Sequence, residues 1–541
     1  MPDSLSSLEK DIVDHYFVLR PSQASGLGLH EYDGLLPNLS KSETSRWSAT
    51  ARELLDRLKS VPDAKLDPLR RFDRILLDLL LEGALFDLEQ SKDLDRNPMA
   101  YLFVPDLTNY LIRDYAPVEV RIASAQRILA GVPALLQNAK DRLERVLPRP
   151  FVTLAIQIAS GLPAHFAEAE DLAAQHSTAL RDEVRSATEP ANRAVVTFAE
   201  WLKAERLAGA NDDFALGKER FQRLLWVREG LTTSVEEVLR RGRSDLKRNQ
   251  DRLVEIARRE GVSPEQLFAR LNEDHPTEKE LLPLAQHLTD EVKEFIRHED
   301  LVSVPEPAIC NVRETPEWAR GLWTAAMSPP GPFEKPVDGI YWVTAVDPSW
   351  KPSEKEGWLR TLNRSMLKNT TVHEVWPGHY LQALHLRKTE QSLARKVWFS
   401  YSFCEGWAHY CEQAALEAGF DGRSTRAEAT QLRDALLRDS RLIVSISMHT
   451  QDMSVEQATR FLQTEAHVEE IHAKREAIRG TYNPEYFCYT LGKLSILDAR
   501  AKYLQPRFGG SVKAFHDSVL SFGTPPIGFL DGLLSSAGHP S

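Results

Sequence analysis

The sequence contains little cysteine. Its 541 residues include only four, Cys310, Cys404, Cys411 and Cys488. A disulfide-stabilised scaffold is therefore excluded. None of the four forms a Cys-x-x-Cys pair, which argues against a thiolate zinc site. Cys404 and Cys411 lie two helical turns apart, and we expect them to pack as small hydrophobic side chains.

Long basic runs and long apolar runs are also lacking. The net charge is −11, which makes nucleic acid and anionic membrane surfaces poor partners. The charged stretch 238–260 mixes both signs at helical spacing, as expected of a solvated helix face. No run of 18 apolar residues predicts a membrane span, and the first residues have neither region of a signal peptide. We expect a cytoplasmic monomer or homodimer that contacts neither nucleic acid nor membrane.

The remaining composition is that of a globular protein, with 42% hydrophobic and 27% charged residues. From about residue 46 the apolar residues recur at helical spacing, and capping sequences at Ser234, Ser263, Thr277 and Ser454 predict helix starts. The stretch 339–346 is the best strand candidate. We predict a mainly α, two-lobed body with a small β-sheet or hairpin near 338–347. Its lobes are residues 1–300 and 301–541, with a cleft between them and the metal site in the second.

The most informative stretch is Thr371–Gln382, in which His373 and His379 bracket Glu374. Two imidazoles and a carboxylate can serve a hydrolytic zinc site as two ligands and a base. The two histidines are six residues apart, so on a regular helix their rings would point about 120° apart. Pro377-Gly378 predicts a widened turn that brings the second histidine back beneath the first.

The alternative for this stretch is a helix that ends at Trp376, followed by two ordinary surface histidines. The clustering of histidines favours a metal site, because seven of the sixteen fall between residues 373 and 472. A second run places Glu405, His409 and Glu412 on one helix face among apolar residues. Such a stripe is costly to bury unless charge or metal compensates it, so a solvent-facing stripe is the alternative. Glu405 is the candidate third ligand, since a carboxylate from a later helix often completes such a site.

Tyrosines and arginines cluster further along the chain. Tyr482, Tyr486 and Tyr489 fall within eight residues, in a turn that opens a helix, and could donate phenol hydrogens to an oxyanion. Taken alone, they are more often packing residues. Arg441 or Arg479 could bind a substrate carboxylate, which would favour short peptides or C-terminal trimming.

Together these motifs resemble a known family. The run His373-Glu374-Val375-Trp376-Pro377-Gly378-His379, followed by Glu405-Gly406-Trp407-Ala408-His409-Tyr410-Cys411-Glu412, is similar to the bacterial family called domain of unknown function 885. Supporting similarity lies in Gly26–Asp33, Arg441–His449 and Tyr489–Leu494, so the resemblance spans the chain. It implies a helical, gluzincin-like zinc peptidase with ligands His373, His379 and Glu405 and with Glu374 as base.

Two positions depart from the family pattern. Ser445 stands where the family commonly has aspartate, and Asn483-Pro484-Glu485-Tyr486 stands where it commonly has Pro-Gly-Gln. These changes put the substrate pocket in doubt more than the metal ligands.

From these features we predict a hydrolase that binds one Zn²⁺ per chain and cleaves peptide bonds, with Glu374 moving the proton. Tyr489 or His449 would stabilise the oxyanion, and Glu412 or His409 would orient a ligand. Two alternatives stay open. One is a metal-dependent amidase that acts on a non-peptide substrate, and the other is a non-catalytic helical binding protein that keeps the motif for structure.

Overall fold

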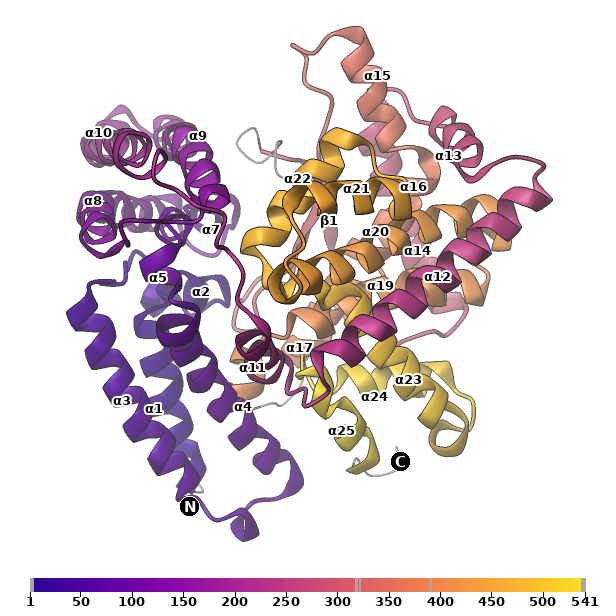
Figure 1. The fold of residues 1–541 in the computed structure, drawn as a ribbon, viewed down its shortest axis with the longest axis horizontal. Coiled ribbons are helices and arrows are strands. Elements are labelled where there is room, and N and C mark those ends of the chain that lie inside the picture. The colour runs from indigo at the N-terminus through magenta and orange to yellow at the C-terminus, as the bar shows by residue number, and fades with distance from the viewer. Residues whose placement is uncertain (1–3, 317–319, 321–322, 389–391, 537–541) are drawn as a thin grey trace. The chain divides into compact units, whose positions relative to one another are not determined.

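The computed structural model describes residues 4–316, 320, 323–388 and 392–536. These residues form helices and one small sheet (Figure 1). The predicted mainly α class with a small sheet is confirmed. The chain divides into two compact units, which are described separately below.

The first unit comprises Met1–Leu216 with two later segments, Gly331–Pro336 and Ser392–Val397. Both later segments are held by side chains from early helices or turns. His30 Nε2 lies 3.3 Å from a Glu334 carboxylate oxygen, and Arg395 Nε donates to Asp73 at 2.7 Å. The helices of this unit are α1 (Ser4–Val18), α2 (Pro21–Gly26), α3 (Lys41–Lys59), α4 (Pro68–Leu85), α5 (Asp93–Arg96), α6 (Met99–Leu102), α7 (Thr108–Ile112), α8 (Val118–Arg142), α9 (Arg149–Ala174), α10 (Thr178–Trp201) and α18 (Leu393–Val397).

Helix α9 is long and apolar enough to cross a membrane by length and composition, and is the one helix of the described part with this property. The expectation that the protein contacts no membrane stays a prediction. About a third of its apolar window is buried in the first unit, where α9 packs against α8 and α10. A core helix of a soluble protein passes the same test, so this property alone is weak evidence of a membrane span.

The second unit comprises Gly217–Pro330, Val337–Gln391 and Trp398–Ser541. Its helices are α11 (Lys218–Glu229), α12 (Val235–Arg259), α13 (Pro264–Glu273), α14 (Leu281–His298), α15 (Pro352–Thr361), α16 (Arg364–Glu374), α17 (His379–Lys388), α19 (Tyr401–Ala418), α20 (Thr425–Thr450), α21 (Val455–Ala466), α22 (Glu470–Tyr482), α23 (Cys488–Phe508), α24 (Val512–Leu520) and α25 (Leu530–Ser536).

The boundary between the units lies at residues 216 and 217, whereas the sequence prediction placed it near residue 300. The difference comes from α12, which packs along α20. Arg252 pairs with Glu428 across these two helices, and Asn249 donates to Asp439 at 2.7 Å. Long-range pairing of this kind attaches the stretch from α11 to α14 to the second unit.

The sheet of the second unit has the strand order β1-β3-β2, with β1 (Cys310–Glu314), β2 (Ala325–Ser328) and β3 (Gly339–Val343). The central strand β3 runs parallel to β1 and antiparallel to β2, and every residue of β3 is buried. The strand predicted at 339–346 is therefore present and ends three residues earlier. The sheet contacts α14, α16 and α17.

Local capping explains several helix starts. Ser263 with Gln266 and Ser454 with Gln457 form complete capping boxes, and Ser234 accepts a hydrogen bond from the backbone of Glu237. The start predicted at Thr277 is displaced, because Thr277 to Glu280 form a turn and α14 begins at Leu281. Helix ends move easily by a few residues when a turn can satisfy the same donors.

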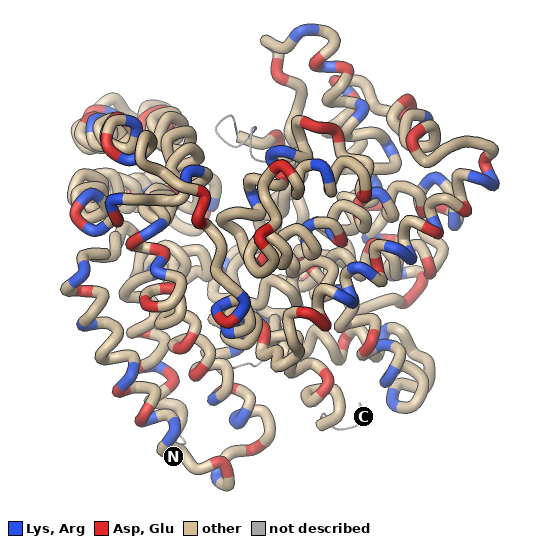
Figure 2. The backbone as a smooth tube through the Cα atoms, viewed as in Figure 1, with Lys and Arg blue, Asp and Glu red and all other residues tan. Residues whose placement is uncertain are grey.

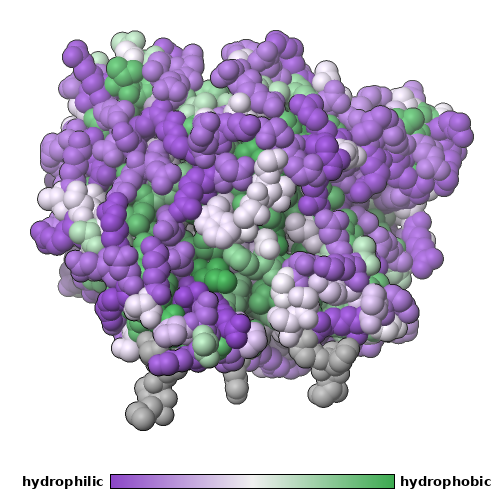
Figure 3. Space-filling view, turned by 60° about the horizontal axis from the view of Figure 1, so that its bottom comes forward, coloured by the Kyte–Doolittle hydropathy of each residue, from purple (hydrophilic) through white to green (hydrophobic). Residues whose placement is uncertain are grey.

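Charged residues of both signs alternate along the helices (Figure 2). On α12 they form ion pairs within the helix, such as Arg240 with Glu237 and Arg259 with Glu255. The face drawn in Figure 3 is mostly hydrophilic, with hydrophobic residues visible between polar ones. The charged stretch of α12 is thus a solvated helix face, as its sequence predicts.

Candidate metal centre

The chain leaves regular helix between His373 and His379. The backbone N–H of Val375 and that of Trp376 both donate to the carbonyl of Thr371, at 2.9 and 3.3 Å. Gly378 N–H then reaches back six residues to the carbonyl of Val372, at 3.2 Å. Helix α16 ends at Glu374 and α17 begins at His379, so the turn between them is wider than one helical turn.

Only glycine fits in this turn. A Cβ atom on Gly378 would lie 1.7 Å from the carbonyl oxygen of His373, well inside van der Waals contact. The close approach folds the start of α17 against the end of α16. The imidazole rings of His373 and His379 consequently lie 4.8 Å apart between centroids and almost perpendicular, at 89°. His373 is buried, with 6% of its surface exposed, so it is no ordinary surface histidine.

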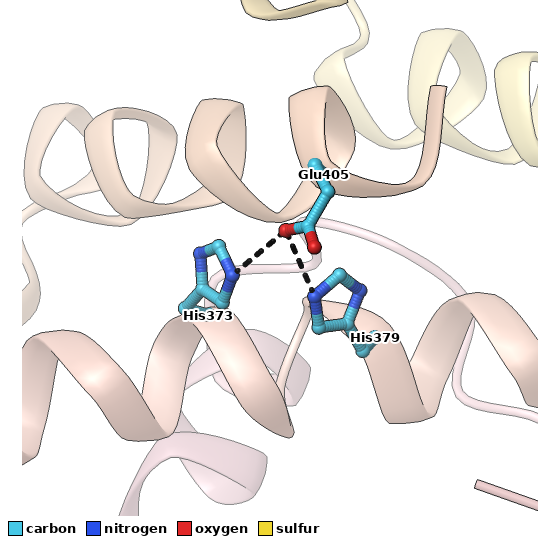
Figure 4. A group of neighbouring side chains, drawn as sticks. All are labelled: His373, His379 and Glu405. Carbon is cyan, nitrogen blue, oxygen red and sulfur yellow. Dashed lines mark ion pairs between the residues drawn. The ribbon is translucent and has the colours of Figure 1, made fainter. Parts of the chain in front are cut away.

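Glu405 reaches the two imidazoles from α19 (Figure 4). One carboxylate oxygen, Oε2, lies 3.4 Å from Nε2 of His373 and 3.4 Å from Nε2 of His379. That oxygen is buried and has no hydrogen-bond partner in the described part of the chain. The ligand atoms of the three residues all lie within 4.8 Å of one another.

This geometry fits a tetrahedral zinc ion. Zinc–ligand bonds of about 2.0–2.1 Å at tetrahedral angles place neighbouring ligand atoms about 3.4 Å apart. Both contacts of Glu405 Oε2 have this length. The buried oxygen without a partner is also explained, because a cation would satisfy it. His373, His379 and Glu405 are therefore suited to hold the metal, with a fourth position left for water or substrate.

Behind His373 lies a buried group of charges. The Nδ1–H of His373 donates to Glu412 at 2.7 Å, and Arg438 and His409 donate to the same carboxylate. Burial alone would raise the pKa of Glu412, but Arg438 and His409 outweigh it and hold that pKa well below its ordinary value. A carboxylate behind a ligating histidine fixes the ring's tautomer and orientation.

The charges around His373 favour a cation. Burial alone would lower the pKa of His373, yet Glu405 and Glu412 raise it to about 9. Burial likewise would raise the pKa of Glu405, but His373 and His379 hold it well below its ordinary value. A divalent cation would take the place of a proton on these groups.

Glu374 is half-buried beside the metal group. Its carboxyl pKa is raised by burial, an effect that His373 and His379 partly offset. It follows His373 directly at the end of α16 and makes no hydrogen bond to another side chain within the described residues. A carboxylate with these properties can accept a proton from a reacting group.

Helices α19 and α23 approach each other closely at a pair of glycines. A Cβ atom on Gly406 would lie 2.4 Å from Gly492, and one on Gly492 would lie 1.7 Å from the carbonyl oxygen of Ser402. This approach brings the first turn of α23, with Tyr489, near Glu405. Burial and the charge of Glu405 both raise the pKa of Tyr489 above its ordinary value.

Not every predicted site residue joins the group. His449, a predicted oxyanion donor, is buried and donates to the Gly480 carbonyl at 2.9 Å. It lies 11 residues beyond Arg438 on α20, or about 16 Å along the helix axis. This bond links α20 to α22, and the role of His449 as an oxyanion donor stays a prediction.

The remaining predicted residues lie around α22 and the first turn of α23. Arg441 pairs with Glu476, at 2.7 and 2.8 Å, and also lies over the Tyr486 ring. Arg479 lies over the same ring, with its Cζ 4.7 Å from the Tyr486 ring centre. The pKa of Tyr482 is raised by burial and lowered in part by Arg479, which places this tyrosine beside the cluster.

Sequence reasoning missed Arg438, although the structure pairs it with Glu412. No motif marks it, and its only signal is a position one helical turn before Arg441. The two departures from the family pattern prove to be neighbours. The hydroxyl of Ser445 donates to the carbonyl of Pro484 at 2.7 Å, so the changes share one contact.

Comparison with known proteins gives a family and a fold. A family described as "Bacterial protein of unknown function (DUF885)" matches residues 21–534. A structure described as a "putative lipoprotein of unknown function" from Shewanella oneidensis has a TM-score of 0.81 and 23% identity, covering 99% of this chain and 100% of that one. A "putative lipoprotein" from Colwellia psychrerythraea has a TM-score of 0.81 and 19% identity, covering 98% of each chain. No curated protein matches.

These neighbours correct the predicted location. Both are described as putative lipoproteins, and a lipoprotein is held at a membrane by its lipid anchor. The sequence prediction was a cytoplasmic protein. That prediction is contradicted. It rested on first residues that have neither region of a signal peptide.

Proposed function

The chain belongs to the DUF885 family of bacterial proteins of unknown function, and we propose that it is a zinc-dependent hydrolase of peptide bonds in short peptides. The observation that carries this proposal is the pair of 3.4 Å contacts from Glu405 Oε2 to the two imidazoles. Their length equals the ligand–ligand distance of a tetrahedral zinc site. Glu374 beside them adds the base that hydrolysis requires.

Each residue has a distinct part in the reaction. His373, His379 and Glu405 would hold a zinc ion, which would supply Lewis acidity toward water and toward a carbonyl oxygen. Glu374 accepts a proton from the attacking water as its oxygen bonds to the carbonyl carbon. Glu374 then delivers that proton to the amine nitrogen as the carbon–nitrogen bond breaks. Tyr489 would donate its phenol hydrogen to the developing oxyanion.

Glu412 and Arg438 support this chemistry indirectly. Glu412 holds the Nδ1–H of His373, which leaves Nε2 of that ring as the ligand atom. Arg438 and His409 hold Glu412 in turn, so its carboxylate cannot rotate toward the metal. The histidine thus keeps one tautomer and one orientation.

The decisive experiment is Glu374→Gln. The variant should bind about one zinc per chain, measured by elemental analysis, because Glu374 is no ligand. Its kcat on a panel of short peptides should fall by roughly 10³-fold or more, since the proton acceptor is lost. Unchanged turnover would remove Glu374 from the mechanism. Wild-type protein that binds no zinc and cleaves no peptide would sink the proposal.

A further inference from the structure

Arginine and tyrosine side chains alternate from the metal centre outward. Arg438, which pairs with the Glu412 carboxylate, has its Cζ 5.6 Å from the centre of the Tyr489 ring. Arg441 lies 5.3 Å from the same ring and 4.9 Å from the Tyr486 ring. Arg479 lies 4.7 Å from the Tyr486 ring. The three guanidinium groups therefore form one series with the two aromatic rings.

Two of the three arginines have a counter-charge. Arg438 donates to Glu412, and Arg441 forms a bidentate ion pair with Glu476. Arg479 differs from both. Within the described residues its guanidinium makes no hydrogen bond and no ion pair, although the side chain is half-buried. Among the described residues, Arg479 is thus the one guanidinium of the series whose N–H donors no carboxylate occupies, although its charge also acts on Glu476.

The contact with Tyr486 leaves the donors of Arg479 available. A guanidinium that stacks its face on an aromatic ring keeps its N–H groups in its own plane, where they can bind another group. These N–H groups match the two oxygens of a carboxylate. The buried hydroxyl of Tyr486 beside it also makes no hydrogen bond in the described part of the chain. Both observations point to an anionic ligand that supplies acceptors here.

The series links Arg479 to the metal centre. Arg438 stands at its other end and pairs with Glu412, which accepts a hydrogen bond from the candidate ligand His373. A peptide spans about 3.5 Å per residue. In a substrate whose scissile carbonyl lies at the metal centre, the residues on one side of that carbonyl would run along this series toward Arg479.

We propose that Arg479 binds the C-terminal carboxylate of the substrate and selects short peptides with a free C-terminus. The cleavage step rests on the proposed function, whereas the binding step does not. Arg441 was the other candidate from the sequence. Glu476 occupies its paired donors, so the free carboxylate falls to Arg479.

The activity test uses matched substrates and a matched control variant. Tripeptides of varied composition are supplied as free acids and as C-terminal amides to the zinc-loaded protein. The wild type should prefer the acids by about 10- to 100-fold in kcat/KM, because a hydrogen bond between charged groups typically contributes a factor of this size to binding. Arg479→Met should reduce this preference to within about 3-fold, chiefly by raising KM for the acids. Arg475→Met, an exposed position one turn earlier on α22, should keep the wild-type preference.

A binding test separates this inference from the proposed function. Calorimetry with the same acid and amide pairs is carried out on Glu374→Gln, which should hold peptides without cleaving them. The acids should bind at least about 10-fold tighter, and adding Arg479→Met should abolish the difference. Arg479→Lys, which keeps the charge but not the paired donors, should retain only part of it. Preferential binding of acids without any cleavage would support Arg479 and overturn the hydrolase.

Three results would overturn the role of Arg479. The first is equal binding of acids and amides to the wild-type site. The second is equal loss of preference in Arg479→Met and Arg475→Met, which would mean that general charge is responsible. The third is a preference that follows acidic side chains in amidated peptides, because the terminal carboxylate would then not be the recognised group.

Discussion

Glu412 is a buried carboxylate that three side chains of the site hydrogen-bond. It is 1% exposed, and it receives hydrogen bonds from His373, His409 and Arg438. A buried carboxylate is tolerated only when its charge is matched and its oxygens are hydrogen-bonded. Both conditions hold here, which makes Glu412 the link between the metal ligand and the positive charge of α20.

Glu412→Gln tests that link. The amide keeps the size of the side chain but loses the charge that orients His373, so zinc affinity should fall by about 10- to 100-fold. Competition with a chelator of known affinity measures this change. Glu417→Gln, on the exposed end of the same helix, should leave zinc affinity unchanged. Equal affinity in Glu412→Gln and wild type would show that His373 needs no carboxylate behind it.

The buried ring of His449 has a consequence for stability. Burial lowers its pKa to about 4, and the Gly480 carbonyl only partly opposes this. The unfolded chain binds the proton near pH 6.5, so the folded state binds fewer protons between about pH 4 and 6.5. The stabilising contribution is therefore complete above about pH 6.5 and is lost as the pH falls toward 4.

His449→Gln should flatten that pH dependence. Glutamine can still donate to the Gly480 carbonyl but does not titrate. Between pH 7 and pH 4.5 the wild type should lose about 2–3 kcal/mol more unfolding free energy than the variant. Urea unfolding at a series of pH values measures this difference. Parallel curves for both proteins would contradict the buried neutral state of His449.

At the level of single residues, the sequence allowed a prediction where neighbouring residues form a recognisable spacing. The pair His373 and His379 with Glu374 could be recognised because the Pro377-Gly378 insertion offers a way to close the gap. The role of His449 could not be judged, since a buried histidine bonded to a carbonyl has no distinctive sequence pattern. The Arg479 and Arg441 alternatives were separated only by the position of Glu476 on α22.

Among the elements, the broken helix of α16 and α17 determines the site. Two short helices joined by this widened turn project their histidines toward each other, which a continuous helix could not do. The turn depends on Gly378, whose backbone touches the His373 carbonyl. The position of α19 depends in the same way on the contact between Gly406 and Gly492.

Gly378→Ala should disrupt both folding and metal binding. Its methyl group would overlap the His373 carbonyl, and relief requires a backbone shift that costs about 3 kcal/mol or more. Gly357→Ala is the matched control, because nothing lies within 4 Å of a Cβ there. It should stabilise α15 by about 0.5–1 kcal/mol. Chemical denaturation and zinc content of both variants measure the contrast, and similar results for the two would refute the close turn.

At the scale of the whole molecule, the helical class and small sheet followed from hydropathy pattern, but the division into units did not. The segments Gly331–Pro336 and Ser392–Val397 belong to the first unit through contacts such as His30 with Glu334 and Arg395 with Asp73. These partners are about 300 residues apart in sequence. Pairing over such a distance leaves no local periodicity from which a boundary could be predicted.

All three candidate zinc ligands lie in the second unit, so zinc should stabilise the molecule unevenly. A ligand present at 1,000 times its Kd stabilises the state that binds it by about 4 kcal/mol. In hydrogen–deuterium exchange, zinc should therefore slow exchange in α16, α17 and α19 relative to protein treated with chelator. Helices α8 to α10 of the first unit should exchange at the same rate in both states.

Two histidine variants are the controls. In His379→Ala zinc should have no effect, whereas His472→Ala, an exposed position on α22, should respond like the wild type. A wild-type protein whose α16 and α19 ignore zinc would contradict the metal centre, and equal slowing in α8 to α10 would show that the two units unfold together.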